Sequence, residues 1–214
     1  TDMKVVTAHK GVDAVNVVII GQEAHSSQTQ LGYSAIMAAG KLIQFVGEMM
    51  AENASGSNKD TNFEPDHTTM TVNMIHGGTA LNILAGHCEM TWDIRSLPGD
   101  DAQQYISRFT TFCNDTVLPE MLKTAPRSKI EINVRAGTPA LQFEVDSEAE
   151  RLCRQLTGDN AVRAASYAAE AGQFQEAGLS TVICGPGSIA QAHKANEFIT
   201  LEQVELGTRF MSHL

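Results

Sequence analysis

The order of two apolar periodicities between residues 12 and 134 constrains this chain most. Alternating apolar residues predict half-buried strands, and apolar residues three and four positions apart predict amphipathic helices. The predicted elements are strand 14–20, helix 31–50, strand 69–74, strand 90–94, helix 102–113 and strand 129–134. This order is typical of a ferredoxin-like βαββαβ sandwich, which we expect to span residues 12–133.

The residues on either side of this unit follow a different pattern. The predicted elements there are strand 3–6, helix 147–156, strand 161–165, helix 170–177, strand 180–184 and helix 201–213. Residues 134–214 contain only the two predicted strands 161–165 and 180–184, which cannot form a sheet by themselves. We therefore expect that segment and residues 1–11 to be parts of one larger α/β layer. The predicted fold class is therefore α/β (α+β), with the ferredoxin-like unit inserted into a partial α/β domain.

Composition excludes several classes of partner. The chain has 15 basic and 25 acidic residues, a formal charge of −10, and no basic run that would bind nucleic acid. Its apolar stretches, such as residues 15–20, are too short to span a bilayer, and no signal pattern begins the chain. Its four cysteines are widely spaced, which favours reduced thiols. We therefore expect a cytoplasmic protein with no nucleic-acid or membrane partner.

A glycine-rich loop near the C-terminus is the first candidate for chemistry. Gly185-Pro186-Gly187 follows a predicted strand and superficially matches a dinucleotide-binding turn. We reject that interpretation, because Pro186 removes a backbone donor and too few residues follow for the ribose-binding acid. The loop could instead position His193 for a metal, with Glu197 accepting from the other ring nitrogen. The alternative is a loop histidine bonded only to backbone, because no second His or Cys lies at ligand spacing.

His25 is the second candidate. It lies in Ala24-His25-Ser26-Ser27, between the strand and the helix predicted at 14–20 and 31–50. In one interpretation His25 donates a hydrogen bond to a developing oxyanion. In the other, Ser26 or Ser27 caps the helix and His25 is incidental. A serine nucleophile is disfavoured, because the chain has no Gly-x-Ser-x-Gly elbow.

Four ordered motifs carry a family resemblance over essentially the whole chain. They are Gly21-Gln22-Glu23-Ala24-His25-Ser26-Ser27, Gly77-Gly78-Thr79-Ala80-Leu81-Asn82, Asp93-Ile94-Arg95-Ser96-Leu97-Pro98-Gly99, and Cys184-Gly185-Pro186-Gly187 leading to Glu197. Together they resemble the M20 metallopeptidase family, and within it the acetylornithine deacetylase branch. The resemblance implies a zinc hydrolase whose catalytic α/β domain binds two zinc ions, with cobalt or manganese as alternatives. It also implies that the inserted ferredoxin-like lid forms a homodimer.

The resemblance assigns roles to individual residues. His25 resembles the catalytic lid histidine that reaches the partner's active site and stabilises the tetrahedral intermediate. Asn82 and Arg95 resemble lid residues that bind substrate carboxylate groups. Gly187 lies in the loop that closes over the substrate, and His193 resembles a metal-ligand histidine.

The resemblance also indicates what the sequence does not supply. The family's other metal ligands and its glutamate base belong to a segment that precedes the residues matching Thr1. We therefore expect this chain to be a C-terminal portion that is inactive by itself. Glu170 matches a Glu of this branch but receives no firm role, and Glu197 is expected to support His193.

The implied reaction is hydrolysis of a small-molecule N-acyl amino acid. The first candidate is N-acetyl-L-ornithine, giving L-ornithine and acetate as in arginine biosynthesis. N-succinyl-diaminopimelate and dipeptides are alternative substrates within the same family. A different class of function stays open as well, in which the chain is a non-catalytic dimerisation module.

Overall fold

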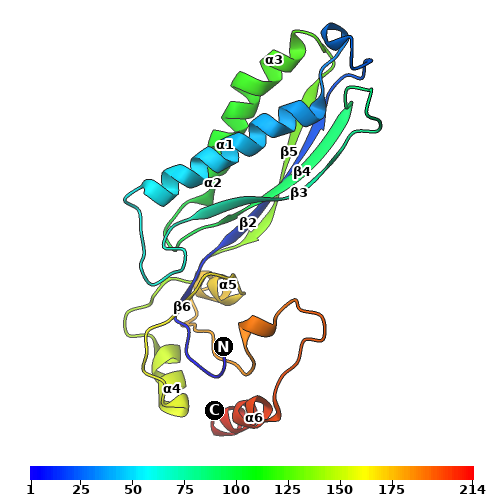
Figure 1. Ribbon diagram of the computed structural model, residues 1–214. Helices are drawn as coiled ribbons and strands as arrows, with labels where there is room; N and C mark the ends of the chain where they lie inside the picture. Colours follow the sequence, from blue (N-terminus) through cyan, green and yellow to red (C-terminus); the bar gives the residue numbers. More distant parts are fainter.

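The computed structural model describes residues 1–214, apart from the side chain of Ala136. An elongated sandwich, residues 12–138, joins end-on to a terminal unit formed by residues 1–11 and 139–214 (Figure 1). The four strands of the sandwich form one antiparallel sheet in the order β3-β4-β2-β5. Their bounds are β2 (Val12–Ile20), β3 (Thr69–Gly77), β4 (His87–Arg95) and β5 (Lys129–Thr138). The predicted ferredoxin-like arrangement is confirmed.

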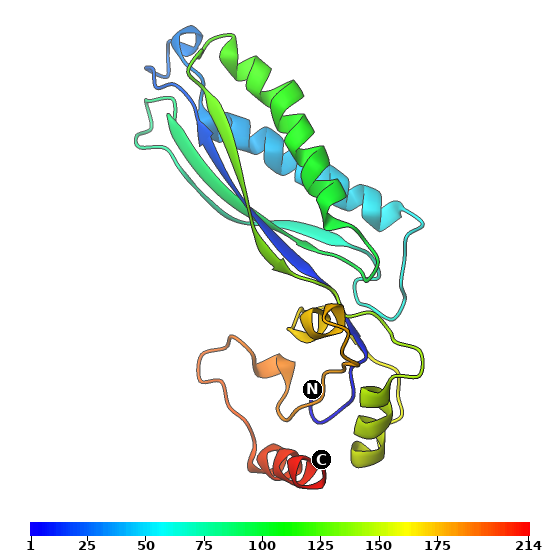
Figure 2. The same cartoon turned by 180° about the vertical axis from the view of Figure 1, so that it is seen from behind.

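Helices cover one face of this sheet (Figure 2). They are α1 (Ala35–Ser55), α2 (Ala102–Phe112) and α3 (Leu118–Leu122). Alternate residues of β4 are buried against them, and Trp92 packs on Phe109 with ring centroids 4.9 Å apart. The other face is polar; there Asn16 donates to Glu89 at 3.1 Å. None of the described helices has the length and apolar character needed to cross a membrane.

Two helices differ from their predicted bounds. The first begins at Ala35 instead of residue 31, because Tyr33 pairs in a bridge with Gln22 and Ala35 N donates to Ala85 O at 2.8 Å. A short 3-10 turn, η1 (Thr29–Leu31), precedes it. The second continues beyond residue 113 through a π-helical segment, η2 (Cys113–Val117), into α3. Pro119 lies just after this segment, in the first turn of α3.

The terminal unit is built around a short parallel pair of strands. β1 (Ala8–His9) pairs with β6 (Ala164–Ala165), beside helices α4 (Glu148–Thr157), α5 (Ala171–Glu176) and α6 (Leu201–His213) and the 3-10 turn η3 (Ile189–Gln191). The strands predicted at 3–6 and 180–184 are wrong. Segments 3–6 and 180–184 pair only through one isolated bridge, between Val6 and Ile183. Among the described residues, the sheet of the terminal unit contains β1 and β6 and no third strand that would extend it.

The connection between the two units is buried and polar. Lys10 Nζ donates to the carbonyl oxygens of Pro65 at 2.8 Å and His67 at 2.5 Å. His9 Nδ1 donates to Lys10 O at 2.8 Å, and its Nε2 accepts from Gly172 N at 3.2 Å. On the other connection β5 continues to Thr138, so the boundary expected at residue 133 lies inside a strand. The chain thus passes between the sandwich and the terminal unit twice, before β2 and after β5.

Candidate functional site

The residues selected from the sequence form two groups at opposite ends of the sandwich. His25 and Asn82 lie on loops at the end far from the terminal unit (Figure 1). Arg95 ends β4 at the opposite end, next to the unit that carries Gly187 and His193. Strands rise about 3.3 Å per residue, so the length of β4 separates the groups by roughly 30 Å. One chain therefore does not bring its own His25 to its own His193.

Backbone pairing holds the loops of His25 and Asn82 together. His25 forms an antiparallel bridge with Ile83, and Ser26 N donates to Asn82 O at 2.9 Å. Ser27 N donates to His25 Nδ1 at 3.2 Å, and Ser27 Oγ lies 2.8 Å from the same nitrogen. Because Nδ1 accepts, the neutral ring carries its proton on Nε2. The exposed imidazole can therefore donate a hydrogen bond from the tip.

The capping interpretation of these serines is wrong. The N-cap of α1 is Ser34, and the 3-10 turn before it is preceded by Gln28. Neither Ser26 nor Ser27 therefore stands at the beginning of a helix. The role of His25 as a hydrogen-bond donor to an oxyanion stays a prediction.

A cleft of about 720 Å³ lies between the same loops. It is lined by residues 21–23 of the His25 loop and by Gly77, Gly78 and Thr79 of the Asn82 loop. Its basic side chains are His76, His87 and Arg127, with Glu23 as the opposing acid. This lining can bind a ligand that carries a carboxylate beside a polar group.

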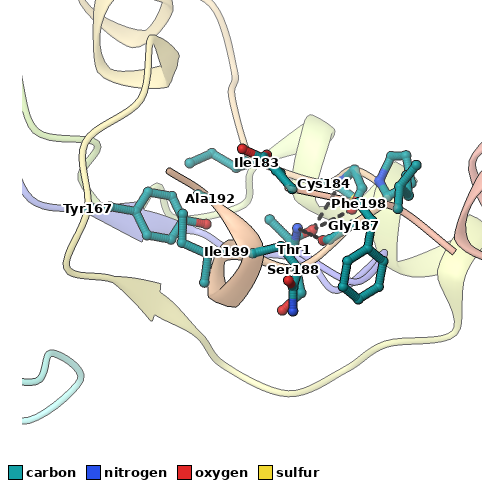
Figure 3. Close-up of a pocket in the computed structure, with 14 residues that line it drawn as sticks. Thr1, Tyr167, Ile183, Cys184, Gly187, Ser188, Ile189, Ala192 and Phe198 are labelled. Carbon is teal, nitrogen blue, oxygen red and sulfur yellow. Dashed lines mark hydrogen bonds between the residues drawn. The ribbon is translucent and has the colours of Figure 1, made fainter. Parts of the chain in front are cut away.

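The glycine-rich loop lines a second cavity, of about 560 Å³ (Figure 3). Gly187 has a φ of +83°, which disfavours any residue with a side chain. Its carbonyl oxygen accepts from Thr1 N at 2.8 Å and from Asp2 N at 2.7 Å. Gly187 N donates to Gln203 Oε1 at 3.0 Å. The loop is thus fixed from both sides, with Tyr167 also on the cavity wall.

His193 and the two acidic candidates lie in the same unit. The imidazole of His193 is exposed, and Glu197 Oε2 accepts from its backbone N–H at 3.3 Å. Glu197 therefore contacts the His193 backbone, whereas the sequence suggested the ring. Glu170 is the N-cap residue of α5. Burial lowers the pKa of His9, and the nearby Glu170 carboxylate raises it by a smaller amount.

The described residues do not fit a zinc site by themselves. Four-coordinate zinc takes three or four protein ligands, and residues 1–214 contain no group of three His, Cys, Asp or Glu side chains that could hold a metal. His193 offers a single exposed imidazole.

A pair of cysteines was not apparent from the sequence. The neighbouring Cys184 side chain lowers the pKa of the Cys153 thiol, and the same contact raises the pKa of Cys184. Burial instead raises the pKa of Cys113 to about 12. Thirty residues lie between the two paired cysteines, so only the fold of the terminal unit brings them together.

The fold and these sites define a peptidase dimerisation domain attached to part of an α/β unit. The sequence model described as "Peptidase dimerisation domain" of the M20 peptidases matches residues 7–121, more than half of the chain. The chain belongs to the M20 peptidase family.

Two curated relatives are acetylornithine deacetylases. That of Myxococcus xanthus is 31% identical over 199 residues, which are 93% of this chain and 50% of that protein. That of Photorhabdus laumondii is 29% identical over 214 residues, which are 100% of this chain and 54% of that protein. The chain thus spans about half the length of these relatives. Among solved structures, aminopeptidase PepT from Bacillus cereus has a TM-score of 0.73 at 21% identity, covering 98% of this chain and 52% of that one, which supports the fold.

Proposed function

We propose that this chain is the substrate-orienting and dimer-forming portion of a zinc-dependent M20 amidohydrolase. It deacylates an N-acyl amino acid, with N-acetyl-L-ornithine as the first candidate, in a cytoplasmic step of arginine biosynthesis. Similarity to two acetylornithine deacetylases along 93% and 100% of the chain supports the substrate class. The observation that carries the proposal is the exposed His25 ring, whose Nδ1 accepts from Ser27 so that Nε2 donates.

The residues divide the work as follows. Hydrolysis of an amide passes through a tetrahedral intermediate whose oxyanion needs a hydrogen-bond donor. His25 Nε2 is that donor, and Asn82 beside it binds a carboxylate group of the same substrate. Arg95 binds the substrate carboxylate. His193 contributes one imidazole to the metal, with the remaining ligands supplied from outside the described residues, so the chain alone is expected to be inactive.

The proposal includes a homodimer. His25 lies at the far end of the sandwich from its own terminal unit (Figure 1), so its substrate lies in a second copy of the chain. The edge strand β3 has no charged residue apart from His76, and Met74 and Ile75 are exposed on it. The opposite edge, β5, carries Lys129, Glu131 and Arg135, which protect an edge from pairing. We therefore place the two-fold interface at β3.

The test uses the protein expressed from its complete reading frame. Acetate release from N-acetyl-L-ornithine is measured beside release from N-succinyl-diaminopimelate and hydrolysis of a dipeptide. We expect His25→Ala to lower kcat by about 10²- to 10³-fold, the usual effect of removing one oxyanion donor. His213→Ala is the matched control, because His213 is an exposed histidine of α6 whose ring hydrogen-bonds to Arg209 O of its own helix.

Each alternative has its own outcome. A preference for the succinyl compound or the dipeptide would retain the family chemistry and replace the substrate. A stable dimer without hydrolysis of any of the three compounds would favour the non-catalytic dimerisation module. Full activity of His25→Ala would contradict the role of His25 as the oxyanion donor.

A further inference from the structure

Asp93 is the centre of a hydrogen-bond cluster on the open face of the sheet. Its Oδ2 accepts from Arg95 Nε at 2.9 Å. Its Oδ1 accepts from Thr71 Oγ1 at 3.0 Å and from Asn73 Nδ2 at 3.0 Å. The Asp93 side chain is 14% exposed and that of Arg95 38%. One oxygen of the Asp93 carboxylate therefore accepts from two side chains of β3, and the other accepts from Arg95.

An irregularity in β3 lies beside this cluster. Thr71 lies directly opposite Asp93, and the register then shifts between Val72 and Met74. The shift inserts Asn73 as an extra residue, as a β-bulge does, and re-aims its side chain. In a regular ladder Asn73 would lie opposite Thr91, on the same face as Asp93 and two residues along β4 from it. As the extra residue of the bulge, Asn73 donates to Asp93 Oδ1 beside Thr71.

The position of the contact on the guanidinium decides what the arginine can bind. A guanidinium has five N–H donors, and the pair of terminal nitrogens matches the two oxygens of a carboxylate. Asp93 occupies Nε, and among the residues that the structure describes no hydrogen bond engages the two terminal nitrogens of Arg95. The terminal pair is left free and the side chain is restrained.

We propose that Asp93 is a positioning residue that holds Arg95 by Nε so that its terminal nitrogens receive the carboxylate of the substrate. This inference rests on the proposed function, because it presumes that Arg95 binds that carboxylate. It adds how that carboxylate is bound: end-on, by the two terminal nitrogens of Arg95. Asp93 touches no reacting atom in this arrangement.

The kinetic test compares two substrates and two variants in the protein expressed from its complete reading frame. Asp93→Asn should raise KM for N-acetyl-L-ornithine about tenfold or more with little change in kcat, the scale of a lost hydrogen bond to a charged group. KM for the carboxamide of the same compound should not change. Glu89→Gln is the matched control, because Glu89 is another carboxylate of β4 on the same face, bonded to Asn16 at 3.1 Å. Asn73→Ala should give a smaller rise in KM, which keeps the test open if Asp93→Asn folds poorly.

A spectroscopic test on the chain itself separates this inference from the proposed function. The Nε–Hε resonance of Arg95 in the ¹⁵N-labelled chain should be sharp and slow to exchange, and Asp93→Asn should broaden it. If the complete protein hydrolyses acyl amino acids and Asp93→Asn leaves KM unchanged, the positioning role is overturned. If it hydrolyses none, the proposed function fails, and titration of the chain with acetate decides the inference: a shift of the Arg95 resonance that is lost in Asp93→Asn supports it, and no shift overturns it.

Discussion

At the scale of single residues, the environment of each cysteine predicts its reactivity. The neighbouring Cys184 side chain lowers the pKa of Cys153, whereas burial raises the pKa of Cys113 to about 12. Because the thiolate is the nucleophile, iodoacetamide at pH 8 should alkylate Cys153 well before Cys113. Peptide mass mapping over time measures both rates. Cys184→Ala should slow labelling of Cys153, and equal rates in both proteins would contradict the role of Cys184.

His9 predicts a pH dependence of stability. Burial lowers its pKa in the folded state, whereas in the unfolded chain it titrates near 6.5. The unfolded state therefore binds more protons as the pH falls through 6.5, so the free energy of unfolding should decrease below that pH. Urea unfolding at pH 7.5 and 5.5 measures the change. His9→Gln should flatten this decrease, while His213→Gln, an exposed control on α6, should leave it intact.

At the scale of elements, apolar periodicity predicted the sandwich because its strands and helices each bury one face. The helix ends were wrong where long-range contacts decide: the Gln22–Tyr33 bridge delays α1, and the π-helical segment extends α2 past residue 113. The strands expected at 3–6 and 180–184 were wrong for a related reason, since a strand needs a neighbour that its own sequence does not encode.

Two glycines of the terminal unit differ in how closely the backbone approaches them. A Cβ on Gly172, in α5, would lie 2.1 Å from Pro139 O, whereas a Cβ on Gly185 would have no neighbour within 4 Å. Gly172→Ala should therefore destabilise the chain by about 2 kcal/mol or more, because the backbone must move to relieve the overlap. Gly185→Ala is the matched control and should change stability little. Thermal melts of both variants test this, and an equal loss of stability would contradict the steric account.

At the scale of the whole molecule, the sequence identified candidate residues but not their placement. Loop position and the family resemblance selected His25, Arg95 and His193, yet only the fold shows that His25 lies at the opposite end of the sandwich from the other two. Likewise, Asp93 stood in a recognised motif, but its partners Thr71 and Asn73 become visible only through strand register and the bulge. Distances between elements depend on topology, which local periodicity does not encode.

The proposed dimer gives the last prediction, because its edge strand has a matched counterpart. Ile75 on β3 and Val134 on β5 are apolar edge residues, 44% and 45% exposed. In a two-fold interface each substitution occurs twice, so Ile75→Lys adds two positive charges to the proposed interface. We expect Ile75→Lys to weaken the dimer at least about tenfold in sedimentation equilibrium, since charged residues on an edge oppose pairing.

Val134→Lys should leave the association constant unchanged, because β5 already carries charged residues and lies on the other edge of the sheet. Loss of the dimer in Val134→Lys with its retention in Ile75→Lys would move the interface to β5. If the wild-type chain is monomeric at micromolar concentration, the proposed dimer is wrong. His25 could then not reach the active site of a second copy.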